Sequence, residues 1–264
     1  MAKIKTKDEI VLLHESGKRL ARVLAVVKEA IKPGITTKDL DILAEKLIRD
    51  AGDVPPFLNY TPRGATKPFP ASLCVSLNDE IVHGIPSATR IIKDGDVVSV
   101  DLGLSHHGLI TDAALTVAVG KTSPEIAMLV KGTERSLYEG IKAARAGGHI
   151  GDIGAAIARV AEEHGYGIVR ELGGHGVGHQ VHEDPYVPNY GKKGAGPILK
   201  EGMVLALEPM FMLGKEAIIV LPDGYTVSSK DGSISAHFEH TIVITKNGAE
   251  ILTRTSHSSS VISN

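Results

Sequence analysis

An internal repeat limits the folds open to this chain more than any other feature of its sequence. Segments 93–101 and 200–208 share one pattern: a lysine, an acid, a glycine, any residue, a valine, and alternating positions that end in a carboxylate. Such alternation is typical of a β-strand, and its recurrence indicates a duplicated unit. A chance match is the alternative, and agreement along the whole segment makes it the weaker one. We therefore expect two related halves, at roughly 8–120 and 121–252.

Apolar residues recur at helical spacing and predict two successive helices in each half. No linker rich in proline, glycine or serine separates the halves, so we expect one domain over 1–264 with a shared core. Only the serine-rich tail, 254–264, is expected to be loose. The predicted fold class is α+β, with two pseudo-symmetric halves that form a curved antiparallel sheet covered by helices. The expected helices span 8–32, 38–50, 124–145 and 152–164.

Composition excludes several classes of protein. The net charge is −2, so the overall balance favours neither DNA nor a membrane surface as partner. The N-terminal segment has no apolar signal core, and no apolar stretch approaches the length of a membrane span. The single cysteine, Cys74, cannot form an internal disulfide and suits a reducing compartment. We therefore expect a cytoplasmic, monomeric protein.

Two aspartates flank a predicted hairpin. If His106-His107 forms its two-residue turn, Asp101 faces Asp112 across adjacent strands, with Cβ atoms about 5 Å apart. Like charges so placed are destabilising, so the pair must share a proton or hold a cation. A slipped register would separate the two aspartates, and a bulge near Gly103 would shift the pairing by one residue.

The second half adds two acids, Glu208 at the end of the repeated strand and Glu239 at the start of a β run. Four carboxylates at one centre would repel strongly, and two metal ions fit this set better than one. Oxygen-rich ligation with one nitrogen indicates Mn, Fe, Co or Zn. The candidate nitrogen ligands are His83, His175 and His182, although a lone histidine is usually structural or solvated. His175 stands out because glycines flank it on both sides.

At these residues the chain resembles the type I methionine aminopeptidases, which have the pita-bread fold, and the match covers nearly the whole sequence. Two histidines match those that contact substrate in the family: His83 in Val-His-Gly-Ile-Pro and His182 in Val-His-Glu-Asp-Pro. Five positions match the family's metal ligands: Asp101 in Ser-Val-Asp-Leu-Gly, Asp112 in Ile-Thr-Asp-Ala, His175 in Gly-Gly-His-Gly-Val-Gly, Glu208 in Leu-Glu-Pro-Met and Glu239 in His-Phe-Glu-His-Thr.

The resemblance implies removal of the initiator methionine from nascent polypeptides whose second residue is small, by dinuclear metal-hydroxide hydrolysis of the peptide bond. It implies two divalent ions (Co, Mn, Fe or Zn) that Asp112 and Glu239 bridge. Asp101 would chelate one ion, and His175 with Glu208 would bind the other.

The resemblance also assigns the catalytic roles. Glu208 would accept the proton of the attacking water and pass it on. His83 and His182 would contact the scissile amide and stabilise the tetrahedral intermediate.

The methionine pocket departs from the family pattern at some positions. Phe69, Cys74 and Tyr225 match pocket walls, but Tyr225 stands where a tryptophan is typical. Val181 replaces a typical phenylalanine, and Thr66 stands where a tyrosine is common. These departures put strictness for methionine in question, while the chemistry should be unaffected.

Two other interpretations stay open. One is a different pita-bread metallopeptidase, such as a proline-directed aminopeptidase, although such enzymes usually carry a further N-terminal domain. The other is a non-catalytic module that binds peptides, although such relatives have usually lost metal ligands. Lys3, Lys5 and Lys7 form a basic cluster that is compatible with ribosome docking but is more typical of a solvated chain end.

Overall fold

The computed structural model describes residues 3–62 and 64–254. Its elements, in chain order, are α1 (Lys7–Ala30), α2 (Thr37–Asp50), β1 (Leu73–Leu77), β2 (Glu80–Val82), β3 (Val97–His106), β4 (Leu109–Ala118), α3 (Pro124–Ala143), α4 (Ile150–His164), β5 (Gly167–Ile168), β6 (Gly173–Gly176), β7 (Glu183–Pro188), β8 (Val204–Leu207), β9 (Met210–Met212), β10 (Ile218–Val220), β11 (Val227–Ser229), β12 (Ser235–His237), β13 (Glu239–Thr245) and β14 (Gly248–Ile251).

The helices begin at residues whose side chains satisfy free backbone N–H groups. Thr6 and Glu9 form a reciprocal capping box at the start of α1, and Thr36 and Asp39 form another at the start of α2. The α4 helix ends at Gly165, which takes the left-handed conformation that closes many helices. All four helices lie within a few residues of the predicted ranges, so the helix prediction is confirmed.

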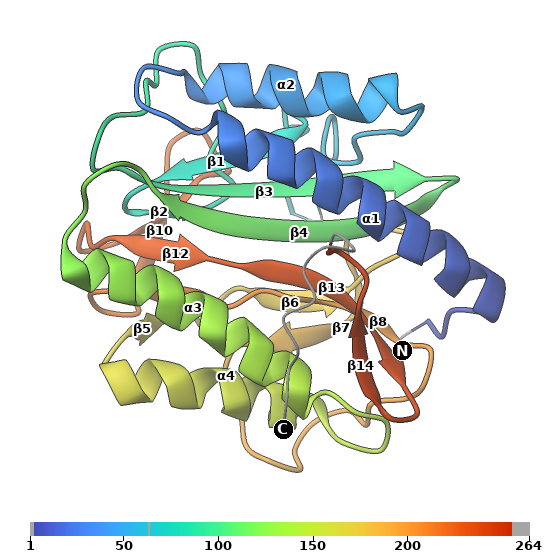
Figure 1. The fold of residues 1–264 in the computed structure, drawn as a ribbon. Coiled ribbons are helices and arrows are strands. Elements are labelled where there is room, and N and C mark those ends of the chain that lie inside the picture. Colours follow the sequence, from blue (N-terminus) through green and yellow to red (C-terminus); the bar gives the residue numbers. More distant parts are fainter. Residues whose placement is uncertain (1–2, 63, 255–264) are drawn as a thin grey trace.

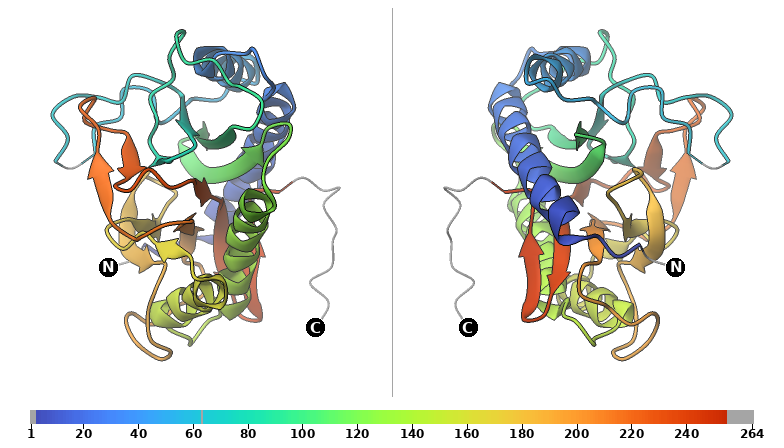
Figure 2. Two further views of the ribbon diagram at one scale, coloured as in Figure 1. Left: turned by 90° about the vertical axis from the view of Figure 1, so that its left-hand side faces the viewer. Right: turned by 90° about the vertical axis from the view of Figure 1, so that its right-hand side faces the viewer.

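The main sheet is antiparallel and runs through both predicted halves. Its strand order is β1-β3-β4-β13-β8-β6-β7, with β14 paired to β13. The strands of 8–120 meet those of 121–252 where β4 pairs with β13. Figure 1 shows the helices lying across this sheet, and the side views of Figure 2 place α1 and α3 on one side of it and the β10–β11 hairpin on the other. The predicted α+β fold class is therefore confirmed, while the common origin of the halves stays a prediction.

Alternation along the strands separates the core from the opposite sheet face. On β3, Val98, Val100 and Leu102 pack with α1 and α2 in one apolar cluster. On β8, Leu205 and Leu207 pack with α3 and α4 in another. Because successive side chains of a strand point to opposite faces, the residues between these positions face away from the helices. Polar groups on that second face therefore escape the apolar core.

The hairpin of β3 and β4 has a turn one residue later than predicted. His106 pairs with Leu109, which leaves His107-Gly108 as the two-residue turn. Both turn residues have positive φ, 49° at His107 and 80° at Gly108. This turn type favours glycine at its second position, so the expected turn at His106-His107 was wrong.

The corrected register changes how the aspartates meet. Asp112 pairs with Gly103, and Asp101 pairs with Ala114 near the middle of β3. No bulge interrupts the pairing near Gly103, so that alternative is also wrong. The shift amounts to two positions in the pairing, which preserves the face of every side chain. Asp101 and Asp112 are therefore diagonal neighbours on one face.

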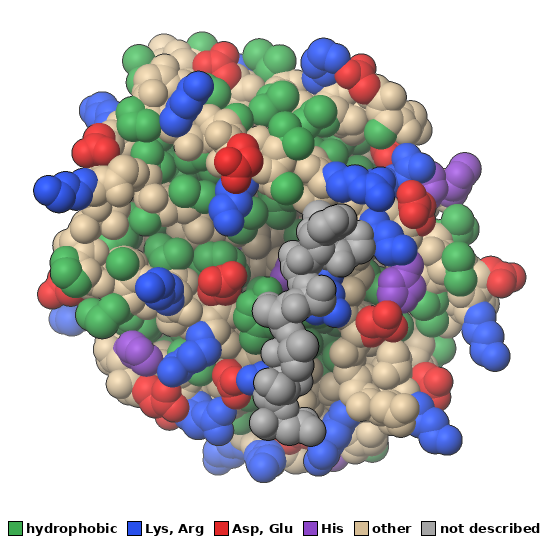
Figure 3. Space-filling view, in the orientation of Figure 1, with side chains coloured by type: hydrophobic (Ala, Val, Ile, Leu, Met, Phe, Trp, Pro, Cys, Tyr) green, Lys and Arg blue, Asp and Glu red, His purple; other side chains and the backbone are tan. Residues whose placement is uncertain are grey.

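The surface agrees with the balanced composition. On the face shown in Figure 3, acidic and basic side chains are mixed over the helices. In the described part of the chain, no helix is long and apolar enough to cross a membrane. Lys5, expected at a solvated chain end, is instead buried, with its Nζ 2.7 Å from Oε2 of Glu183. The loose tail expected over 254–264 lies, beyond Arg254, outside the described residues.

Candidate active site

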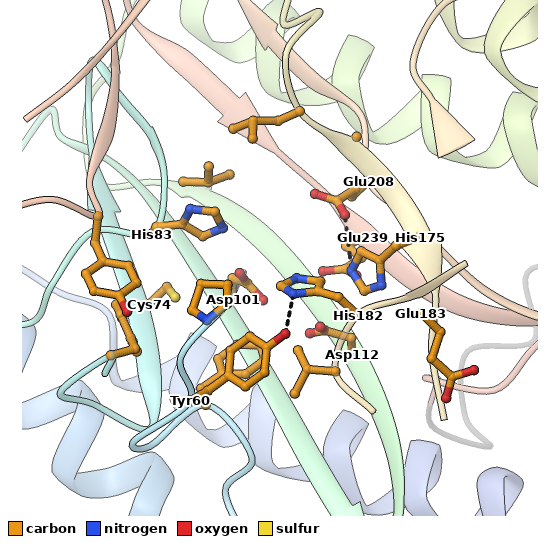
Figure 4. Close-up of a pocket in the computed structure, with 18 of the residues that line it drawn as sticks. Tyr60, Cys74, His83, Asp101, Asp112, His175, His182, Glu183, Glu208 and Glu239 are labelled. Atoms are coloured by element: carbon orange, nitrogen blue, oxygen red, sulfur yellow. Dashed lines mark hydrogen bonds and ion pairs between the residues drawn. The ribbon is translucent and has the colours of Figure 1, made fainter. Parts of the chain in front are cut away.

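The structure brings every predicted site residue to one cavity of about 620 Å³. The five predicted metal ligands, the two predicted substrate histidines and the three predicted pocket residues all line it. Figure 4 shows the acids and histidines pointing toward one another from separate strands. Residues far apart in the sequence therefore form a single site.

Five neighbouring strands of the main sheet supply the predicted ligands, one from each strand. Asp101 lies on β3, Asp112 on β4, Glu239 on β13 and His175 on β6, while Glu208 directly follows β8. Direct strand partners project to the same face of a sheet. Asp101 and Glu239 both pair with Ala114, and His175 pairs with Ala206, two residues before Glu208. The pairing therefore directs all five side chains to the face opposite the helices.

The arrangement of donor atoms fits a metal. Ligand atoms of Asp112, His175 and Glu239 lie within 4.8 Å of one another. His175 Nε2 lies 3.4 Å from Glu208 Oε1. One carboxylate oxygen each of Asp101, Asp112 and Glu239 is buried with no hydrogen-bond partner within the described residues. A buried, unpaired carboxylate is costly, and a divalent cation would satisfy these oxygens.

The electrostatics of the site indicate the same need for a cation. Burial raises the pKa of Asp101 to about 7, and the charge of Glu208 adds to the rise. Burial likewise raises the pKa of Glu208 to about 8, with a contribution from Asp112. Burial raises the pKa values of Asp112 and Glu239 well above their ordinary range. The carboxyl groups therefore retain protons near neutral pH until a cation displaces them.

The histidines of the site are held in the neutral form. Burial, with the nearby His182 as a smaller cause, lowers the pKa of His175 to about 3. Burial also lowers the pKa of His83 to about 4, and desolvation within the cavity lowers that of the more exposed His182 below its ordinary value. A neutral imidazole can ligate a metal or donate one hydrogen bond, so all three suit a metal-dependent site.

His83 is placed by an unusual backbone conformation. Its φ is 60°, in the left-handed region that non-glycine residues rarely adopt. The next residue, Gly84, lies against β1, where an added Cβ would be 2.2 Å from the carbonyl oxygen of Val75. Gly84 also donates to Ser76 Oγ and accepts from Val75 N. These contacts hold the strained residue at the cavity wall, as is common at functional sites.

The apolar side of the cavity comes from the predicted pocket residues. Phe69 and Tyr225 meet edge to face, with ring centroids 5.2 Å apart. Cys74 and Val181 are buried beside them and also line the cavity. Thr66, considered for the pocket from the sequence, is exposed and is not among the lining residues. The apolar wall of the cavity is therefore built without it.

Two further residues of this region were not predicted from the sequence. His237 is buried near Glu208, with Nε2 3.9 Å from Oε2, and neither ring nitrogen has a hydrogen-bond partner among the described residues. Its spacing of two residues from Glu239 could have indicated it, since alternate strand residues share a face. Tyr60, whose hydroxyl lies 2.9 Å from Nδ1 of His182, belongs to a loop without periodicity and gave no such signal.

Comparisons with known proteins agree with this geometry. Residues 11–246 match the model of metallopeptidase family M24. The methionine aminopeptidase of Aquifex aeolicus is 45% identical over 252 residues, which cover 94% of this chain and 97% of that protein. Methionine aminopeptidase 1 of Bacillus subtilis is 44% identical over 250 residues, covering 95% of this chain and 98% of that protein.

A solved structure supports the same assignment. The crystal structure of a methionine aminopeptidase from Thermotoga maritima superposes with a TM-score of 0.92 at 42% identity, covering 96% of this chain and 100% of that one. The sequence resemblance and the pita-bread fold are thereby confirmed. The chain belongs to metallopeptidase family M24 and, within it, to the methionine aminopeptidases.

Proposed function

We propose that this chain binds two divalent metal ions at its five-strand ligand cluster and removes the initiator methionine from nascent polypeptides with a small second residue. One observation carries the proposal: five neighbouring strands each direct one carboxylate or imidazole to the same sheet face. Three of these side chains carry buried oxygens without partners in the described structure. The proposed ligands are Asp101, Asp112, His175, Glu208 and Glu239.

The ligands would divide between the two ions according to their position. Asp112 and Glu239, from the central strands β4 and β13, would contribute to holding both ions. Asp101, on the β3 side, would chelate one ion, and His175 with Glu208 would hold the other. Bound divalent ions would activate water and polarise the scissile carbonyl. Mn, Fe, Co and Zn all suit these oxygen and nitrogen ligands.

The protein's own groups would then move the proton and stabilise the charge. Glu208 lines the cavity with one carboxylate oxygen 3.4 Å from His175 Nε2, and it would accept the proton of the attacking water and pass it on. His83 and His182 line the cavity as neutral imidazoles, so each can donate one N–H to the substrate amide. Such donors act most strongly where negative charge develops on the carbonyl oxygen.

The substrate side chain would occupy the apolar part of the cavity. Phe69, Tyr225, Cys74 and Val181 offer aromatic and small apolar surface beside the carboxylates. A thioether packs well against aromatic rings, which favours methionine over a shorter side chain. Fit of this kind supplies only about 1–3 kcal/mol per methylene, so related side chains should be slow substrates and not excluded ones.

The cellular setting follows from the proposed substrate. Initiator methionine is present on newly made chains, so we propose a monomeric enzyme that acts in the cytoplasm. Of the N-terminal basic cluster, only Lys3 and Lys7 are exposed and available for contact with a ribosome, because Lys5 is buried.

Peptide hydrolysis tests the proposal against the proline-directed alternative. Purified enzyme with added Mn²⁺ should hydrolyse Met-Ala-Ser much faster than Met-Leu-Ser, because a large second residue meets steric limits beside the metals. Ala-Pro-Ser should be hydrolysed slowly or not at all. Preferred cleavage of the Xaa-Pro peptide would overturn the proposed specificity, and cleavage of none of the peptides would overturn the proposed activity.

A further inference from the structure

We propose that Tyr60 is a positioning residue that fixes the tautomer of His182, so that His182 presents an N–H donor at Nε2 to the substrate. The inference rests on the proposed function, since it concerns the same cavity. It adds a residue outside the metal ligands and assigns His182 the role of hydrogen-bond donor, not proton acceptor. Its basis is one contact and the way both partners are held.

The contact joins the hydroxyl of Tyr60 to Nδ1 of the His182 imidazole. Tyr60 Oη lies 2.9 Å from His182 Nδ1, and the ring centroids are 5.4 Å apart with a tilt of 57°. Both residues line the cavity. Figure 4 shows this bond as a dashed line between Tyr60 and His182, with the labelled carboxylates around the same imidazole.

We assign the proton from the donors and acceptors that the two groups offer. Within the described residues, the Tyr60 hydroxyl has one hydrogen-bond partner, Nδ1 of His182. A phenol has one proton to give, and donating it to Nδ1 satisfies both groups. A neutral imidazole then carries its own proton on Nε2, because each ring form has one N–H. The hydrogen bond at Nδ1 thus places the imidazole proton on Nε2.

Tyr60 is held in place by its own loop. Its backbone N–H donates to Phe57 O at 3.0 Å, and its carbonyl accepts from Phe69 N at 2.8 Å. Asn59 N also donates to Phe69 O at 2.9 Å, which closes the loop on the pocket wall. The hydroxyl is therefore presented to His182 from a fixed backbone.

The segment that carries His182 is anchored from the other side. Glu183 Oε1 accepts from the backbone N–H groups of His179 and Gln180, at 2.6 and 3.0 Å. Its second oxygen, Oε2, accepts from the buried Nζ of Lys5 at 2.7 Å. These bonds fix the residues on both sides of His182. A donor held this firmly needs little reorganisation when charge develops on the substrate.

The tautomer determines what His182 can do. With the proton on Nε2, the imidazole stabilises the negative charge that gathers on the carbonyl oxygen. With the proton on Nδ1, a lone pair would face the same oxygen and oppose that charge. Removing the Tyr60 hydroxyl should therefore weaken the chemical step more than substrate binding.

Nitrogen NMR of the wild-type enzyme tests the tautomer directly. The Zn²⁺-loaded protein, labelled with ¹⁵N-histidine, should show an unprotonated Nδ1 and a protonated Nε2 for His182, with the signals assigned by their loss in His182→Asn. A protonated Nδ1 in the wild type would overturn the proposal. This measurement does not require turnover, so it separates failure of the tautomer assignment from failure of the proposed function.

Kinetics of Tyr60→Phe test the consequence. We expect kcat for Met-Ala-Ser to fall roughly tenfold or more while KM changes by less than about threefold. The matched control is Tyr166→Phe, because the ring of Tyr166 also lies against a histidine, His164, but outside the cavity. That control should keep wild-type kinetics. A Tyr60→Phe variant with wild-type kcat, or one altered only in KM, would contradict the proposal.

Discussion

His175 Nε2 lies 3.4 Å from Glu208 Oε1, although the two residues come from different strands of the main sheet. The β6–β8 pairing sets this separation, because His175 pairs with Ala206, two residues before Glu208. Two atoms that each lie about 2.1 Å from one ion at a tetrahedral angle are themselves about 3.4 Å apart. The two side chains therefore already have the spacing of ligands to a common metal.

Replacing Glu208 with Gln should lower kcat by about 10²–10⁴, because the change removes a ligand charge and the proton acceptor together. The side chain is not part of the apolar core, so the melting temperature of the metal-free protein should change little. Glu201→Gln, at an exposed position, is the control and should behave as wild type. Steady-state hydrolysis of Met-Ala-Ser gives the answer, and a loss below tenfold would show that Glu208 has another role.

Metal should stabilise the protein more at high pH than at low pH. Without metal, burial raises the pKa values of Asp101 and Glu208 to about 7 and about 8, above unfolded values of about 4. The folded state then binds more protons than the unfolded state, so the free energy of unfolding falls as pH rises through this window. A bound metal takes the place of these protons, and fewer protons compete with it at high pH. Thermal melts with and without Mn²⁺ should therefore show a larger metal-induced rise in Tm at about pH 8 than at about pH 5.5. An equal rise at both pH values would contradict the assignment of these carboxyl groups as ligands.

The hairpin register should decide whether Asp112 can bind metal. One residue inserted after Ile110 would turn Asp112 to the opposite sheet face. Two glycines inserted between His107 and Gly108 would lengthen only the turn, and loop closure costs little for so small a change. Calorimetric titration with Mn²⁺ should detect binding to the second variant and not to the first. Similar binding by both would mean that Asp112 does not act from this register.

Replacing Gly84 with Ala should disturb His83 through the backbone. The added Cβ would lie 2.2 Å from Val75 O, so the segment must move away from β1. We expect a lower Tm and a lower kcat, with metal affinity close to that of the wild type because His83 is not among the proposed ligands. Unchanged kcat in a folded variant would show that the placement of His83 tolerates this movement.

Much of the site could be predicted because some of its residues are charged where the rest of their strand is apolar. Asp101 and Glu208 interrupt or end apolar strands, where an unpaired carboxylate is costly, so they stood out without any structure. The faces of Asp101 and Asp112 were also predictable, because an error of two positions in register preserves the face. The turn itself was misplaced because the glycine requirement of its second position was overlooked at Gly108.

Other residues could not be predicted, because their roles depend on contacts distant in sequence. Tyr60 and His182 meet only after two loops, one from each half, fold onto one cavity. Lys5 looked solvated in a charged N-terminal segment, yet it is buried through its bond to Glu183. Neither contact leaves a periodic pattern, since pairing across such distances is decided by the topology of the whole sheet.

Metal removal tests the central claim most directly. The enzyme should be treated with a chelator, its metal content verified by elemental analysis, and its hydrolysis of Met-Ala-Ser followed while Mn²⁺ is added back. We predict that activity disappears with the metal and returns as ions bind, with up to two ions held per chain, because Asp101, Asp112 and Glu239 each have a buried oxygen without a partner among the described residues. Undiminished hydrolysis by enzyme shown to be free of metal would contradict the account.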